Sequence, residues 1–201
     1  MTDFLYPFLE REEHDLPSVL ADLEHSTVQK GEDVITLRRA IDLDALEACA
    51  IAMRERLERG GRLISFGNGG SSTDAQDVAL DFLARGWPAV ALTNDTATIT
   101  AVGNDVGYQN VFARQLIPLA RANDIALAIS TSGSSANVVS GLEEAHRRRL
   151  LTCAITGYDG GRLRDLVWLD HLFVVANDYI PRLQEAHATI YHLLLEAVGA
   201  P

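Results

Sequence analysis

Short, continuous apolar runs alternate with helix-like segments along most of this chain. The five runs with the length of buried strands are residues 62–66, 89–92, 125–129, 151–155 and 171–175. Runs that are apolar at nearly every position, rather than at every second one, are typical of strands covered on both faces. Strands that alternate with helices predict a mostly parallel sheet. We therefore expect an α/β fold, a three-layer α/β/α sandwich built on a doubly wound parallel sheet.

Helical periodicity is also present upstream of the first run. Between residues 42 and 59, the apolar residues at helical spacing are Leu43, Leu46, Ala50, Met53 and Leu57. A second helical pattern spans residues 17–39. We divide the chain into an N-terminal helical extension, residues 1–41, and a sandwich domain, residues 42–201. The apolar stripes of the extension predict packing on the core or on a neighbouring subunit.

The charge of the chain excludes two classes of partner. The 201 residues carry a formal net charge of −11, whereas a surface that binds nucleic acid or an anionic membrane needs a local excess of Lys and Arg. No apolar stretch approaches the roughly 20 residues that span a bilayer. The first fifteen residues are aromatic and acidic, unlike a signal peptide. We expect a cytoplasmic protein without nucleic-acid or membrane partners.

Two loops rich in serine and glycine occupy residues 67–72 (GNGGSS) and 130–135 (STSGSS). Each follows an apolar run and precedes a helix-like segment. Such a loop presents unpaired backbone N–H groups, hydroxyl donors and the positive end of a helix dipole, all of which favour a bound phosphate. One loop alone would be explained equally well as an ordinary helix N-cap. Two loops in one small domain favour a phosphorylated small molecule as the ligand.

Four segments carry motifs that occur in this order in one family. They are residues 67–76 (GNGGSSTDAQ), 101–105 (AVGND), 129–137 (ISTSGSSAN) and 182–187 (RLQEAH). Together they resemble the sugar isomerase (SIS) domain family, in particular its phosphoheptose isomerase group. The resemblance implies a homotetramer with active sites between subunits. It also implies a phosphosugar aldose–ketose isomerase that acts on sedoheptulose 7-phosphate to form D-glycero-D-manno-heptose 7-phosphate.

The same resemblance implies roles for individual residues. The phosphate would be held by Ser130, Thr131, Ser132 and Ser135. The rest of the sugar would be bound by Asn68, Ser71, Asp105 and Gln184. A metal, typically zinc in the family, would be held at Asp77, Asp81, Gln184 and His192. Asp81 would act as the base and His192 as the acid of the isomerisation.

Two of these positions depart from the family pattern, which usually has His and Glu where this chain has Asp77 and Asp81. Asp in place of Glu shortens the reach of the base by one methylene group, and a misplacement of about 1 Å can cost about a hundredfold in rate. Asp in place of His leaves three oxygen ligands and one imidazole, which suits magnesium or manganese better than zinc. We therefore expect a divalent metal, and the sequence does not determine which one.

Each candidate residue also has a purely structural interpretation. Asp77 and Asp81 would share one face of a helix, where acidic pairs are usually solvated. His192 lies between Tyr191 and Leu193 and would also fit as a core histidine. His171 and His187 are expected to be structural rather than catalytic.

Two further functions remain open at this point. The altered residues favour a non-catalytic phosphosugar-binding protein, which acts as a sensor or as a tetrameric adaptor of a bacterial replication initiator. A dinucleotide-binding enzyme is the other alternative. The first loop has the wrong spacing for the dinucleotide fingerprint GxGxxG, and the second loop would have no role in it.

Overall fold

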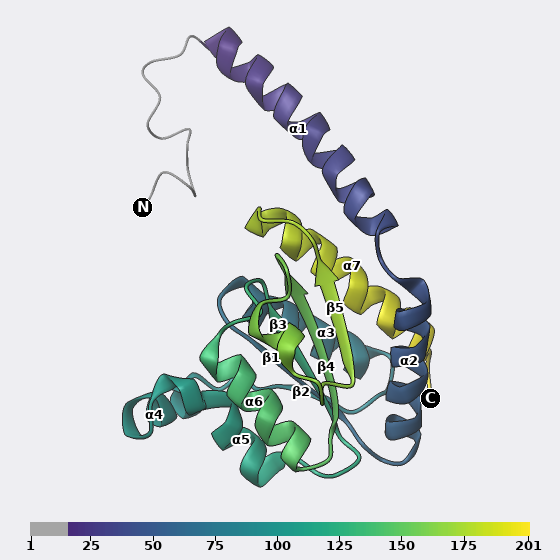
Figure 1. Cartoon of the computed structure of the whole chain (residues 1–201), viewed down its shortest axis with the longest axis vertical. Helices are drawn as coiled ribbons and strands as arrows, with labels where there is room; N and C mark the ends of the chain where they lie inside the picture. The colour runs from purple at the N-terminus through teal and green to yellow at the C-terminus, as the bar shows by residue number, and fades with distance from the viewer. Residues whose placement is uncertain (1–15) are drawn as a thin grey trace.

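The computed structural model of the chain describes residues 16–201 and confirms the α/β sandwich (Figure 1). One sheet contains five parallel strands in the order β2-β1-β3-β4-β5. The strands are β1 (Leu63–Gly67), β2 (Ala89–Ala91), β3 (Ile125–Ser130), β4 (Leu151–Gly157) and β5 (His171–Val175). All five lie within one residue or two of the runs identified in the sequence. Residues 1–15 of the predicted extension lie outside the described residues.

The helices of residues 16–201 connect these strands. They are α1 (Leu16–Arg39), α2 (Leu43–Glu58), α3 (Gly70–Ala84), α4 (Thr96–Asp105), α5 (Val111–Leu119), α6 (Ala136–Arg147) and α7 (Ile180–Val198), with the short 3₁₀ helices η2 (Tyr108–Asn110) and η3 (Gly161–Asp165). Helix α4 was not expected from the sequence. Its N-cap Asp95 accepts a hydrogen bond from the Thr98 N–H at 3.0 Å, and none of its residues is buried. Only Ile99 and Val102 pack against the core, and both are only partly buried, so the apolar pattern of the helix is weak.

Alternate residues of the central strand β3 separate the core into two halves. Leu127 and Ile129 pack with residues of α2, α3 and α7, whereas Ala126 and Ala128 pack with residues of α5 and α6. Figure 1 shows the corresponding layers, with α2 and α7 on one side of the sheet and α5 and α6 on the other. Burial on both faces explains why the strands are apolar at successive positions. No helix within residues 16–201 is sufficiently long and apolar to cross a membrane.

Asp74 is a buried carboxyl on α3, the helix that packs against α7. Its Oδ2 atom has no hydrogen-bond partner among the described residues. Burial, and to a smaller extent the negative charge of Asp77, raises the pKa of Asp74 from 3.8 to about 6. The folded state therefore binds the proton of this side chain more tightly than the unfolded state does.

The sign of this pKa shift predicts how stability depends on pH. The group binds a proton more tightly in the folded state, so its contribution is fully present below pH ~4 and is lost as the pH rises through about 6. A shift of about two units corresponds to roughly 2–3 kcal/mol. We compare the free energy of unfolding of Asp74→Asn with that of the parent by urea unfolding at pH 4 and at pH 7.5. On going from the lower to the higher pH, the variant should become more stable relative to the parent by up to about that amount.

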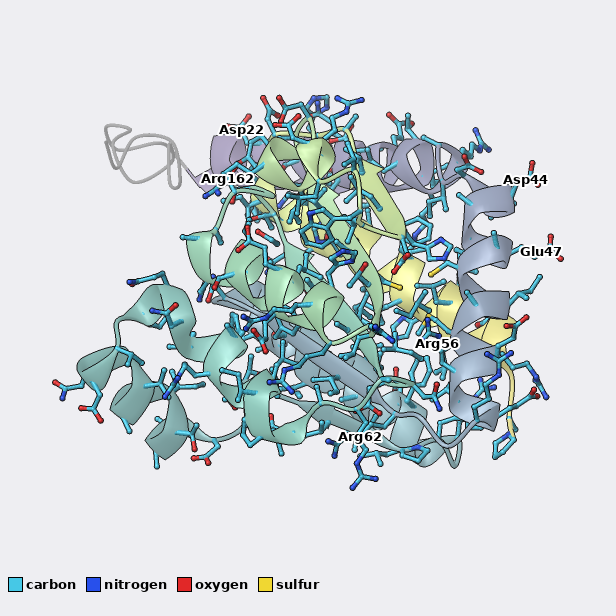
Figure 2. The ribbon with its side chains drawn as sticks, turned by 60° about the horizontal axis from the view of Figure 1, so that its bottom comes forward. Asp22, Asp44, Glu47, Arg56, Arg62 and Arg162 are labelled. Atoms are coloured by element: carbon cyan, nitrogen blue, oxygen red, sulfur yellow. The ribbon has the colours of Figure 1, made fainter. Side chains whose placement is uncertain are left out.

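The matched control is Asp44→Asn, because Asp44 projects from the outer face of α2 (Figure 2). The difference in the free energy of unfolding between this variant and the parent should stay nearly constant between the two pH values. If Asp74→Asn also differed from the parent by a constant amount, Asp74 would be ionised in the folded protein and the assigned shift would be wrong.

Candidate functional site

The two serine- and glycine-rich loops leave the same edge of the sheet. Strands β1 and β3 are parallel neighbours, and Gly67 at the end of β1 is in register with Ile129 near the end of β3. A Cβ atom at Gly67 would lie 2.5 Å from the Ser71 carbonyl oxygen and 2.6 Å from the Ile129 carbonyl oxygen, so no side chain fits here. The tight packing places the two loops side by side, at the carboxyl ends of the strands where α/β folds bind their ligands.

A pair of amide side chains joins the two loops. Asn68 donates to the Asn137 Oδ1 atom at 2.8 Å, and Asn137 donates back to the Asn68 Oδ1 atom at 2.8 Å. The Tyr108 hydroxyl donates to the same Asn68 oxygen at 3.1 Å. The Asn68 side chain thus links the first loop to helix α6 and to η2. Asn137 is buried in the first turn of a helix that follows a candidate phosphate loop, a position whose significance the sequence analysis missed.

The first loop also contacts the last helix of the chain. Helix α3 begins at Gly70, and a Cβ atom at this residue would lie 1.7 Å from the Gln184 Nε2 atom of α7. The Gln184 side chain therefore lies directly on the start of α3. Ser71, the next residue, is buried. The structure brings together Asn68, Ser71 and Gln184 at one end of α3.

The second loop connects β3 to α6. Ser130 is buried at the end of β3, Thr131 is half-buried and Ser132 is exposed. Ser135 is the N-cap residue of α6, but its hydroxyl makes no capping hydrogen bond. The positive end of the α6 dipole therefore adjoins the residues of this loop. This arrangement can hold a phosphate without a Lys or Arg in the loop.

Asp81 and His192 meet across the α3–α7 interface. The His192 Nε2 atom lies 3.3 Å from the Asp81 Oδ2 atom, and both side chains are partly exposed, 52% and 39% respectively. The two residues line a hollow of about 280 Å³ together with Arg85 and Glu196. His192 is therefore not a core histidine. The pair combines a carboxylate and an imidazole in direct contact, which can exchange a proton.

The pair lies some distance from the first loop within the same chain. Eight residues of α7 separate Gln184 from His192, or about 12 Å at 1.5 Å per residue. Eleven residues of α3 separate Gly70 from Asp81, or about 16 Å on the same basis. The candidate site therefore extends along α3 and α7 rather than forming one compact pocket.

The predicted metal ligands do not assemble into a metal centre. Within residues 16–201 no three His, Cys, Asp or Glu residues are grouped closely enough to hold an ion. Asp77 is exposed, and Asp81 is engaged with His192. Three oxygen donors and one imidazole also suit zinc poorly. The residues present do not fit the zinc site that the resemblance implied.

Three carboxylates gather near one phenol on the same face. Burial raises the pKa of Tyr191, and the negative charges of Asp74, Asp77 and Asp81 raise it further. The phenol therefore stays protonated and can only donate or accept hydrogen bonds. Asp105, in contrast, is exposed at the end of α4, three residues before Tyr108, and contacts the Asn104 side chain.

Comparison with known proteins agrees with this architecture. The SIS domain family model matches residues 31–157. A phosphoheptose isomerase of Roseiflexus sp. (strain RS-1) is 43% identical over 169 residues, which are 80% of this chain and 85% of the relative. The structure of a phosphoheptose isomerase from Neisseria gonorrhoeae superposes with a TM-score of 0.82 at 33% identity, covering 90% of this chain and 99% of that one. The enzyme from Francisella tularensis gives 0.83 at 36% identity, covering 90% and 98%.

The family model covers more than half of this chain, and these relatives align with it over most of both chains at 33–43% identity. This chain belongs to the SIS domain family and, within it, to the phosphoheptose isomerase group.

Proposed function

We propose that the chain is a phosphosugar isomerase that converts sedoheptulose 7-phosphate to D-glycero-D-manno-heptose 7-phosphate. The observation that carries the proposal is the Asp81–His192 contact between α3, which follows the first loop, and α7, which carries Gln184. In sedoheptulose 7-phosphate the carbonyl carbon is C2, at the opposite end of the seven-carbon chain from the phosphate. The distance of about 16 Å along α3 within one chain exceeds the span from C2 to the phosphate in this substrate, so the proposed site would be shared between neighbouring subunits.

Binding would begin at the second loop. The hydroxyls of Ser130, Thr131, Ser132 and Ser135 and the free N–H groups of α6 would donate to the phosphate oxygens. Gln184, Ser71 and Asn68 would contact the sugar beyond the phosphate. Asp105 would line the wall of the same pocket. Charge-assisted hydrogen bonds from neutral donors explain how a chain of net charge −11 can hold an anion.

The reaction moves one proton between carbons and one between oxygens. Asp81 would remove a proton from C1 of the ketose, which forms an enediolate, and return it to C2. His192 would protonate the oxygen on C2 as the negative charge develops there and accept the proton from the oxygen on C1. The contact between the two side chains keeps the imidazole oriented and lets the proton pass between them. The product is the aldose, with the carbonyl at C1.

The first prediction from this proposal concerns the Asp81–His192 pair. Asp81→Asn keeps the shape of the side chain but removes the base, so turnover of sedoheptulose 7-phosphate should fall by about 10²–10⁴-fold. Asp77→Asn, one turn earlier on the same helix, is the matched control and should lose little activity. The assay follows aldose formation after treatment with a chelator, and again with added zinc, manganese or magnesium.

The outcomes separate the remaining alternatives. If added manganese or magnesium raises turnover and Asp77→Asn abolishes that gain, a divalent metal held by Asp77, Asp81, Gln184 and His192 would have to be restored to the mechanism. If the parent binds phosphosugar without turnover under any metal, the isomerase proposal fails and a sensor or adaptor remains. Activity that survives Asp81→Asn would show that another residue is the base.

The second prediction concerns the phosphate. Ser132→Ala combined with Ser135→Ala removes two donors from the second loop, and the affinity for sedoheptulose 7-phosphate should fall by about a hundredfold or more, at about 1.5–3 kcal/mol for each hydrogen bond to a charged group. Ser140→Ala, which alters a serine further along α6, should bind normally. Calorimetry measures both variants. An unchanged affinity of the double variant would place the phosphate elsewhere.

Self-association into a homotetramer is part of the same proposal. Helix α1 projects from the sandwich, and only its C-terminal part meets α7 (Figure 1), where Arg182 lies 3.7 Å from Asp33 and Arg38 donates to Thr189 at 3.0 Å. The exposed apolar side chains of α1 are Leu20, Leu23, Val28 and Ile35. An apolar stripe of this kind is stable when other copies of the helix cover it. We also propose that this acidic chain is cytoplasmic and has no nucleic-acid or membrane partner.

The third prediction follows from this stripe. Light scattering at micromolar protein should give the mass of four chains. Leu23→Glu with Val28→Glu should reduce the mass, because burying two carboxylates in an apolar interface is unfavourable. Gln29→Glu changes the charge of the same helix at an exposed polar position and should leave the mass unchanged. A parent chain that is monomeric would remove the basis for sites shared between subunits.

A further inference from the structure

The second loop is hydrogen-bonded to the β4–η3 segment, residues 157–163, which leads from the end of β4 into η3. Gly157 donates its N–H to the Thr131 carbonyl oxygen at 3.0 Å. Leu163 donates its N–H to the Gly133 carbonyl oxygen, also at 3.0 Å. Two carbonyl groups of the loop are thus held by one neighbouring segment, to which the proposed function gives no role.

These two bonds fix the direction of the loop's N–H groups. The carbonyl and N–H groups of a trans peptide unit point in opposite directions, and none of the described peptide bonds is cis. Because the Thr131 and Gly133 carbonyls face the β4–η3 segment, the N–H group of each following residue is directed away from it. The loop therefore turns acceptors toward the segment and donors toward its other side, as anion binding requires.

Gly161 allows the close approach of the segment to the loop. A Cβ atom at Gly161 would overlap the Ser132 carbonyl oxygen and would lie 2.5 Å from the Ser134 Oγ atom. The φ of Gly161 is +51°, which residues with a side chain rarely adopt. The same Ser134 hydroxyl accepts a hydrogen bond from the Arg162 N–H at 3.2 Å. A side chain at position 161 therefore fits only if the loop moves.

The turn that carries Gly161 is held in shape by its own hydrogen bonds. The Asp159 Oδ1 atom accepts from the Gly161 N–H at 3.0 Å, and the Arg164 side chain donates to the Asp159 carbonyl oxygen at 2.9 Å. Tyr158, at the start of the turn, has a φ of +54°. A non-glycine residue keeps such a conformation only where its surroundings fix it. The turn is therefore a defined support for the loop.

We propose that Gly161 is a positioning residue, whose missing side chain lets the β4–η3 segment hold the second loop in the conformation that binds the substrate phosphate. This proposal rests on the assignment of the phosphate to the second loop. The loop contains no Lys or Arg, so its affinity for an anion depends on the direction of neutral donors. A support that fixes this direction contributes to affinity without touching the phosphate.

Gly161→Ala tests this role. The added methyl group displaces the loop, so KM for sedoheptulose 7-phosphate should rise by about tenfold or more. In contrast, kcat should change by less than about twofold, because Asp81 and His192 lie on other elements. Calorimetry with sedoheptulose 7-phosphate and with inorganic phosphate should show the same loss of affinity without depending on turnover. Unchanged affinity for both ligands would overturn the proposal.

Gly60→Ala is the matched control for backbone strain. Gly60 also has a positive φ, +80°, but a Cβ atom there would meet nothing within 4 Å. The residue precedes β1, at the opposite end of the strand from the loops. Both variants should lose thermal stability because of the strained backbone, whereas only Gly161→Ala should lose affinity for phosphate. An equal loss of affinity in both would assign the effect to general destabilisation and overturn the positioning role.

Asp159 provides a second test if Gly161→Ala does not fold. Asp159→Ala removes the acceptor of the Gly161 N–H and should raise KM. Asp159→Asn keeps an acceptor oxygen at that atom and should keep the parent KM. If Asp159 acted on the phosphate through its charge instead, both variants would lower KM, because each removes a negative charge. That result would contradict the role assigned to the turn.

The results distinguish failure of this proposal from failure of its premise. If the double variant of Ser132 and Ser135 binds phosphate normally, the phosphate is not on the second loop, and the positioning role fails with its premise. If that double variant loses affinity while Gly161→Ala and Asp159→Ala bind like the parent, only the positioning role is overturned.

Discussion

The packing of α7 against α3 and against the end of β4 is the constraint on which the rest of the site depends. Gly70 has no side chain, and the Gln184 amide occupies the space that a Cβ atom would need. Leu183, the residue before Gln184, occupies the space that a Cβ atom at Gly157 of β4 would need. Two turns later His192 reaches Asp81. One helix thus contacts the first loop, the end of β4 that is hydrogen-bonded to the second loop, and Asp81, so a shift of α7 would disturb all three.

Electrostatics on the α3–α7 face follow from the aspartates that occupy it. Asp74, Asp77 and Asp81 lie on successive turns, and the buried one, Asp74, has a pKa raised to about 6 because burial and Asp77 disfavour its charge. Asp81, which is partly exposed, has His192 as a partner. The chain therefore carries an Asp–His pair and a buried carboxyl of raised pKa where the family resemblance led us to expect a metal centre. A carboxylate held by an imidazole can act as a base without a cation beside it, and this is the chemistry assigned to the chain.

Most of the fold could be predicted from the sequence because the signals are local. Strands β1 to β5 are short apolar runs bounded by polar or glycine residues, and α2, α6 and α7 show helical periodicity. Helix α4 was missed because none of its residues is buried. The role of His192 was left open because the flanking residues Tyr191 and Leu193 suit a core, and only the placement of α7 shows its imidazole on the surface beside Asp81. The metal site expected at Asp77, Asp81, Gln184 and His192 depends on side-chain distances that no spacing along a helix can supply.

The sequence by itself determined that the chain forms parallel strands with two phosphate-type loops at their carboxyl ends, since periodicity, glycine and serine act within a few residues. The tertiary structure alone decided which side chains meet. The Asn68–Asn137 pair joins residues 69 positions apart, and the contact of Asp81 with His192 spans 111. Such contacts depend on the order and register of the strands and on the packing of whole helices. These are properties of the assembled core, so they are absent from any short stretch of the chain.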